Sequence, residues 1–169
     1  ALIEELKLND VRLVAQSMGG WTCLEYALRH PARVKSLVMA CTSGVVDPGA
    51  VPGFGKSGFD AWNKQAGELN AAMEARGVLA AGGERMAREQ PALAILYRQI
   101  FHLTAGDFRA AVRGRIWAMR DKPPTMLAKL SMPVLFLNGE EDSVFPSPSG
   151  PGLAGFAPKG SHVSVPKAG

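Results

Sequence analysis

One short segment of the sequence combines residues that suit nucleophilic catalysis. Residues 13–20 read LVAQSMGG, in which Ser17 has a small residue two places before it, Ala15, and another two places after it, Gly19. This spacing is typical of a nucleophile elbow, a turn from strand to helix so tight that it strains the serine backbone and exposes the hydroxyl. The small neighbours are expected to prevent clashes within the turn. Helix N-termini carry unpaired N–H groups, so the N–H of Met18 is expected to bind a developing oxyanion.

A serine nucleophile of this kind works with an acid and a histidine, which follow it in the chain in that order. Three carboxylates, Glu140, Glu141 and Asp142, come directly after an apolar run near the end of the sequence. An acid placed there would hold the histidine in one tautomer and stabilise the imidazolium that forms during the reaction. A polar turn after a strand explains all three carboxylates equally well.

The sequence contains three histidines that could act as the base. His162 follows the carboxylates in the required order, but it belongs to an alternating run at residues 162–165 rather than to a loop after it. His30 stands at the end of a predicted helix, where it would serve as a C-terminal cap. His102 lies in a helical region and could line a pocket. None of the three is therefore a good candidate for the base.

The elements that would position these residues alternate between strand and helix. Apolar runs predict buried strands at residues 11–15, 34–40, 132–137 and 162–165. Amphipathic spacing predicts helices at residues 1–8 and 21–30. Glycine and proline predict loops at residues 43–58 and 147–160. This alternation is typical of an α/β protein with a parallel sheet.

A long helical region separates the second predicted strand from the third. It covers residues 59–120, with breaks expected at Gly77, Gly82–Gly83, Pro91 and near Gly106. Two apolar stripes recur there at helical spacing: Phe59, Trp62, Leu69 and Met73, and then Leu93, Leu96, Ile100 and Leu103. Such stripes usually mark the packed face of a helix, so both are expected to be covered.

With these motifs in this order, the chain resembles the α/β-hydrolases. The segment LVAQSMGGWTCLEYALRHPARVKSLVMACT looks like the elbow, the following helix and the next strand of that family, and MPVLFLNGEEDSVFP resembles the later strand that delivers the acid. The helical region resembles the cap of many members. The resemblance implies an α/β fold with a mostly parallel sheet, the C-terminal half of the hydrolase core. It divides the chain into core at 1–43 with the elbow, a helical cap insertion at 44–125, and core at 126–169 with the acid loop and last strand.

The resemblance also implies a capped serine hydrolase with a Ser-Asp-His triad, acting through an acyl-enzyme on an ester, lactone or carbon–carbon substrate. The family places its acid after a strand, a glycine and two further residues, which selects Asp142 behind Gly139. It places its histidine in a turn after the last strand, commonly right after a glycine. The base is therefore expected just after Gly169 rather than at His162.

Further expectations follow from the same resemblance. Phe59, Trp62 and His102 of the cap would shape an apolar substrate pocket. The second oxyanion donor normally comes from a loop after an early strand, and nothing before Val11 can supply one. The sequence is therefore expected to be an internal fragment of a hydrolase. No cofactor is expected, because nucleophile, acid and base are all side chains.

Composition limits the partners that the protein could have. The 169 residues carry a net charge of +4, but lysine and arginine are scattered, so no nucleic-acid partner is expected. No apolar run approaches the roughly 18 residues that span a membrane. Cys23 and Cys41 lie in apolar segments and are expected to be buried free thiols, which favours a cytoplasmic location. No pair of histidine, cysteine or acidic residues has the spacing of a metal site. The expected partner is a small-molecule acyl substrate, and the oligomeric state is open.

Two other functions remain open on the sequence. Residues 50–57, AVPGFGKS, resemble a phosphate-binding loop with alanine in place of its first glycine, so a nucleotide-binding protein is a remote alternative. Its context is poor, because the preceding strand ends near Ala40 and Pro52 removes one N–H from the loop. The second alternative is a non-catalytic relative or an inactive fragment that binds a ligand.

Overall fold

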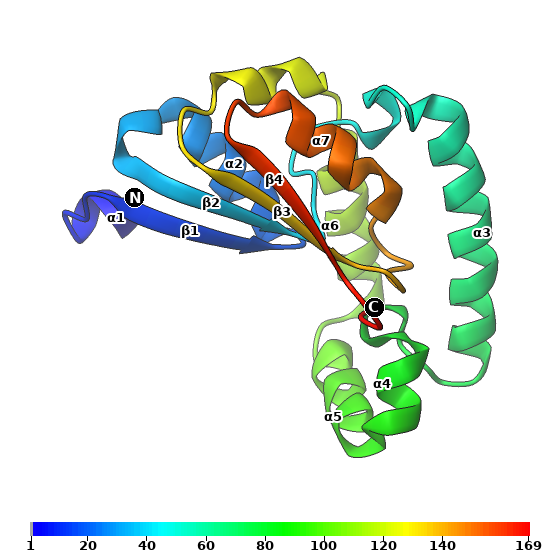
Figure 1. The fold of residues 1–169 in the computed structure, drawn as a ribbon. Helices are drawn as coiled ribbons and strands as arrows, with labels where there is room; N and C mark the ends of the chain where they lie inside the picture. Colours follow the sequence, from blue (N-terminus) through cyan, green and yellow to red (C-terminus); the bar gives the residue numbers. More distant parts are fainter. Residues whose placement is uncertain (1) are drawn as a thin grey trace.

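The computed structural model describes residues 2–169, and its centre is one parallel sheet (Figure 1). The sheet consists of β1 (Val11–Gln16), β2 (Val34–Ala40), β3 (Val134–Gly139) and β4 (Gly160–Val165). All three neighbouring pairs are parallel, and the strand order is β1-β2-β3-β4. The predicted α/β class and parallel sheet are confirmed. The strands lie at or within two residues of the predicted apolar runs, and β2 and β3 carry most of the buried strand residues.

Two helices cover one face of this sheet. Helix α2 (Gly19–Arg29) contacts β1 and β2, and α7 (Gly150–Phe156) contacts β3 and β4. Leu24 of α2 and Leu153 of α7 are fully buried there. The other face carries Val14, which is 73% exposed. The packed core therefore lies on the α2–α7 side and holds the carboxyl ends of the strands in place.

Helix α7 is a correction to the prediction of a loop at residues 147–160. Its sequence, GPGLAGF, contains residues that usually interrupt helices. Proline at the first turn removes only an N–H that a helix leaves unpaired there. Leu153 and Ala154 are buried against the sheet, and this burial outweighs the weak helix propensity of the glycines.

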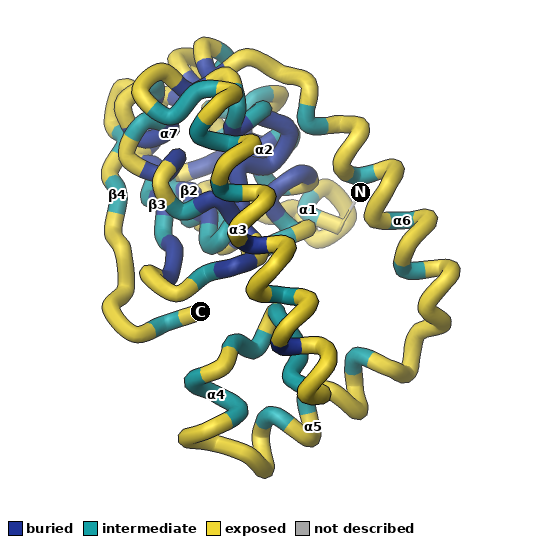
Figure 2. Tube along the Cα trace, turned by 90° about the vertical axis from the view of Figure 1, so that its right-hand side faces the viewer, coloured by how far each residue is buried: buried dark blue, intermediate teal, exposed yellow. Residues whose placement is uncertain are grey.

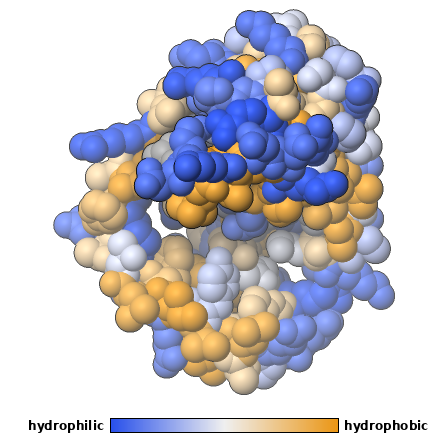
Figure 3. All heavy atoms as spheres, turned by 90° about the vertical axis from the view of Figure 1, so that its left-hand side faces the viewer, coloured by the Kyte–Doolittle hydropathy of each residue, from blue (hydrophilic) through white to orange (hydrophobic). Residues whose placement is uncertain are grey.

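Four helices lie between β2 and β3 in the sequence. They are α3 (Gly55–Ala75), α4 (Gly83–Glu89), α5 (Pro91–His102) and α6 (Gly106–Ala118). Their ends coincide with the breaks that glycine and proline predicted. Figure 1 shows α4 and α5 beyond the end of the sheet where the chain terminates, and α3 running along one side. Figure 3 shows a hollow between the upper part of the molecule and the lower part, where apolar residues gather.

Neither of the two apolar stripes is covered over its whole length as predicted. Met73 of the first stripe is 2% exposed, whereas Leu69 is 42% exposed. In the second stripe the exposed fractions are 47% for Leu93, 51% for Leu96, 54% for Ile100 and 83% for Leu103. Figure 2 shows α5 and α6 largely exposed. Helical spacing identified an apolar face correctly, but it carries no information about what packs on that face.

The remaining elements are short. The predicted helix at residues 1–8 is reduced to α1 (Leu2–Glu5), and Ala1 lies outside the described residues. Short 3-10 helices occur at Pro31–Arg33, Pro48–Ala50, Ala80–Gly82, Pro124–Lys129 and Ser147–Ser149.

Candidate active site

Ser17 occupies the turn between β1 and α2 in a left-handed backbone conformation. Its φ is +48°, a value that residues other than glycine rarely adopt. Residues held in such a conformation cluster at functional sites. The turn is tied on both sides: the N–H of Ser17 donates to the carbonyl of Ala40 at 3.0 Å, and the carbonyl of Ser17 accepts from Gly20 at 3.0 Å. The strained conformation that the elbow motif predicted is therefore present.

The position at which this turn requires a glycine is Gly20, whereas the prediction was Gly19. Ala15 is buried, with 1% exposure. A Cβ placed on Gly19 would have no neighbour within 4 Å, whereas one placed on Gly20 would lie 2.6 Å from Cγ2 of Thr42 and closer still to Oγ1. The prediction that Gly19 prevents a clash is wrong. The close approach is between the first turn of α2 and Thr42, just after β2. A motif of a few residues cannot predict this contact, because the two segments are far apart in the sequence.

Met18 stands at the N-cap position of α2, directly after Ser17. The first N–H groups of a helix have no partner inside it, and the helix dipole favours negative charge there. Met18 and Ser17 also line one cavity, which lies at the carboxyl ends of the strands. Its N–H is therefore well placed to stabilise an oxyanion formed at the serine.

Asp142 is far from Ser17 in the sequence but lines the same cavity. The cavity has a volume of about 320 Å³ at the carboxyl ends of the strands. Its lining consists of Gln16, Ser17, Met18, Gly19, Cys41, Ala81, Tyr97, Asp142, Val144, Phe145 and Gly169. Oδ1 of Asp142 accepts hydrogen bonds from the N–H groups of Val144 and Phe145, both at 2.8 Å. These bonds fix the carboxylate in the loop after β3.

The other two carboxylates of this loop do not line the cavity. Glu141 forms an ion pair with Arg85 of α4, and the hydrogen bond to Arg85 lowers the pKa of Glu141. Glu140 is exposed and does not line the cavity. Of the three, only Asp142 shares a cavity with Ser17.

Cys41 is a cavity residue that the sequence did not single out as functional. It follows β2 directly, has φ +51° and is half-buried rather than buried as predicted. Burial raises the pKa of its thiol to about 11, and the negative charge of Asp142 and a hydrogen bond to that carboxylate add to the rise. Cys41 is therefore a protonated donor to Asp142 at neutral pH. The signal that could have found it is its position at the carboxyl end of a central strand.

The structure places the histidines away from Ser17. Nε2 of His162 lies 2.7 Å from Oδ1 of Asn138, and burial lowers the pKa of His162. His162 does not line the cavity, whereas Gly169 does. His30 is the C-cap of α2, as predicted, and His102 is exposed at the end of α5. No histidine of the described residues 2–169 lines the cavity with Ser17 and Asp142.

The predicted pocket residues do not line this cavity either. Phe59 and Trp62 stack on each other in the first turns of α3, with ring centroids 6.5 Å apart. Instead, Ala81 and Tyr97 reach the cavity from the helical region. Which helix faces the serine depends on how the four helices fold back over the strands.

The phosphate-loop interpretation of residues 50–57 is wrong. The segment follows a 3-10 turn and enters α3, ten residues after β2 ends, so no strand delivers it. Nζ of Lys56 is 3.0 Å from Asp60, and its side chain is 83% exposed. Among residues 2–169, no group of three or more histidine, cysteine or acidic side chains could hold a metal ion.

The sequence profile of the alpha/beta hydrolase fold family matches residues 1–169. The chain belongs to this family. A comparison with curated protein sequences finds no match. No helix within residues 2–169 combines the length and apolar character needed to cross a membrane.

Solved structures of α/β-hydrolases share this fold. The chain is similar to Est816, described as an N-acyl homoserine lactone degrading enzyme, with a TM-score of 0.66, 22% identity and coverage of 100% of this chain and 64% of that one. A thermophilic esterase from Thermogutta terrifontis gives a TM-score of 0.66 at 22% identity, over 99% and 61%. The enol-lactonase from Burkholderia xenovorans gives 0.65 at 17%, over 99% and 61%. The chain thus spans less than two thirds of the length of these three structures.

Proposed function

We propose that the protein is a hydrolase that uses Ser17 as its nucleophile on a small ester, lactone or carbon–carbon substrate. The observation that carries this proposal is that Ser17, held at φ +48°, and Asp142, oriented by two backbone N–H groups, line one cavity. Oγ of Ser17 attacks the substrate carbonyl carbon, and the base takes the hydroxyl proton. The leaving group departs with that proton, and water then hydrolyses the acyl-enzyme.

We assign the remaining roles as follows. The N–H of Met18 is one oxyanion donor. The base is a histidine that follows Gly169, because Gly169 lies at the cavity that holds Ser17 and Asp142. Residues 44–125 act as a cap over this cavity. The ester and lactone chemistry named for the Thermogutta terrifontis and Burkholderia xenovorans structures supports this choice of substrate class.

The experiment is to label the full-length protein with a fluorophosphonate probe and to measure hydrolysis of 4-nitrophenyl acetate. One adduct is expected, on the peptide that contains Ser17. Ser17→Ala should abolish labelling and lower kcat by roughly 10⁴-fold to 10⁶-fold. Ser57→Ala is the matched control, because Ser57 is exposed on α3. His162→Gln should also leave hydrolysis intact.

Two results would overturn the proposal. Activity retained in Ser17→Ala would exclude this serine as the nucleophile. A folded full-length protein that neither reacts with the probe nor hydrolyses the ester would favour the alternative of a non-catalytic ligand binder.

A further inference from the structure

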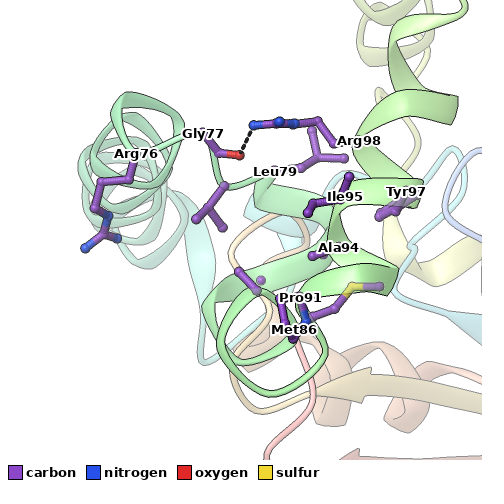
Figure 4. A pocket seen from close by; sticks show the side chains of 13 residues that line it. Arg76, Gly77, Leu79, Met86, Pro91, Ala94, Ile95, Tyr97 and Arg98 are labelled. Atoms are coloured by element: carbon purple, nitrogen blue, oxygen red, sulfur yellow. Dashed lines mark hydrogen bonds between the residues drawn. The ribbon is translucent and has the colours of Figure 1, made fainter.

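A second cavity lies within the helical region, between the end of α3 and the helices α4 and α5. Its volume is about 230 Å³. The side chains that define it are mainly apolar, among them Val78, Leu79, Met86 and Ile95. In Figure 4, Ile95 and Leu79 approach each other across it, and Pro91 and Met86 close it on the side of α4.

The two arginines of this cavity do not make its interior polar. Arg76 forms an ion pair with Glu84, and in Figure 4 its side chain points away from the other lining residues. Arg98 reaches across the opening, where Nη1 donates a hydrogen bond to the carbonyl of Gly77 at 3.0 Å. The arginines are therefore part of the rim, and the space behind them suits a hydrocarbon group rather than an anion.

Tyr97 joins this cavity to the one that contains Ser17. It lines both of them, and in Figure 4 it stands on the side opposite Arg76. The turn before α4 is shared as well, since Ala81 lines the cavity at Ser17 and its neighbour Gly82 lines the second one. A Cβ on Gly82 would lie 3.4 Å from the Tyr97 ring, so the ring packs directly on this turn. The two spaces are thus neighbours, separated by the ring of Tyr97.

We infer that the second cavity binds the hydrocarbon end of a linear acyl chain whose carbonyl carbon is at Ser17, with Tyr97 as the residue that the chain must pass. This inference rests on the proposed function and specifies its substrate class. An apolar cavity of about 150 Å³ holds the six carbons of benzene, so a volume of about 230 Å³ accepts about nine carbons. The substrates are therefore acyl compounds whose chains extend past Tyr97.

The first test is the chain-length profile of the full-length enzyme with 4-nitrophenyl esters from acetyl to dodecanoyl. Each methylene that becomes buried should raise kcat/KM about threefold to fourfold, which amounts to roughly 80-fold or more between butanoyl and octanoyl. Ala94→Trp fills the cavity and should stop this rise near hexanoyl. Ala92→Trp is the matched control, because Ala92 is exposed on the same helix, and it should keep the wild-type profile.

The second test measures binding and does not depend on turnover. Octanoate is titrated calorimetrically into Ser17→Ala protein with and without Ala94→Trp, and a tenfold or greater loss of affinity is expected from the added tryptophan. If no ester is hydrolysed but Ala94→Trp still weakens octanoate binding, the apolar site stands and the proposed function fails. If esters are hydrolysed by Ser17 but Ala94→Trp and Ala92→Trp share one profile and one octanoate affinity, the site is refuted and the proposed function stands.

Discussion

Replacing Gly20 by alanine should destabilise the protein and disturb the elbow, whereas the same change at Gly19 should not. The new methyl group would lie 2.6 Å from Cγ2 of Thr42 and 3.0 Å from its Cβ. The first turn of α2 must then move by about 1 Å away from Thr42 to restore ordinary contacts, because Thr42 is buried and cannot turn aside. Overpacking of this kind costs about 3 kcal/mol at its upper end, and the better helix propensity of alanine offsets up to about 1 kcal/mol. The free energy of unfolding should fall by about 2 kcal/mol.

The effect on activity should exceed the effect on folding. Gly20 donates a hydrogen bond to the carbonyl of Ser17, so a displaced helix moves the nucleophile with it. A misplacement of about 1 Å lowers catalysis by roughly 100-fold. Thr42→Ala should restore part of both losses in the double variant, although by itself it removes the acceptor of the Gly44 N–H and costs about 1 kcal/mol.

The assays are urea denaturation of the full-length protein and hydrolysis of 4-nitrophenyl acetate, for Gly20→Ala, Gly19→Ala, Thr42→Ala and the Gly20→Ala/Thr42→Ala pair. Gly19→Ala is the matched control for stability, because its methyl group would meet open space. Two results would refute the reasoning: equal stability of Gly20→Ala and wild type, or additive losses in the double variant.

Two further predictions concern the half-buried side chains of Cys41 and Arg120. Cys41 holds its proton until the pH approaches its pKa of about 11, so its alkylation by iodoacetamide should be slow at pH 8 and rise steeply above pH 10. Asp142→Asn should speed the alkylation by lowering that pKa. Mass spectrometry of the Cys41 peptide measures both effects, and fast alkylation at pH 8 would contradict the burial argument. The guanidinium of Arg120 lies 4.7 Å from the ring centre of Trp21 and 5.3 Å from that of Trp117, and Arg120→Ala should lower the free energy of unfolding by about 1–2 kcal/mol through lost cation–π contact and packing. Arg120→Lys should retain part of this stability in urea denaturation, and a lysine variant as unstable as the alanine variant would argue against the cation–π contribution.

Most of the sheet could be predicted from the sequence because its signals are local. The run at residues 34–40 forms β2 over the same residues, and the glycines and prolines that interrupt the helical region mark the ends of α3 to α6. The left-handed Ser17 followed from the same kind of signal, since the tightness of the turn is encoded within a few residues. Helix α7 escaped prediction because its stability comes from burial against the sheet and not from its own residues.

Only those cavity residues that follow the strands could be predicted from the sequence. Parallel strands bring their carboxyl ends to one edge, so residues that follow β1 and β3 lie at the same edge, and Ser17 and Asp142 line one cavity there. The helical contribution was not accessible in this way. Phe59 and Trp62 have the apolar character of a pocket, yet Ala81 and Tyr97 line it.

By itself, the sequence determined the parallel α/β sheet, the strained serine and the acid loop, because each depends on the periodicity or turn chemistry of a short segment. Only the tertiary structure decided that Gly20 and not Gly19 is the crowded position, that the α5 stripe is exposed, and that Tyr97 separates two cavities. The physical reason is the same in all three cases. Each depends on the distance between segments far apart in the chain, and that distance is set by the packing of whole elements rather than by the preferences of the residues within them.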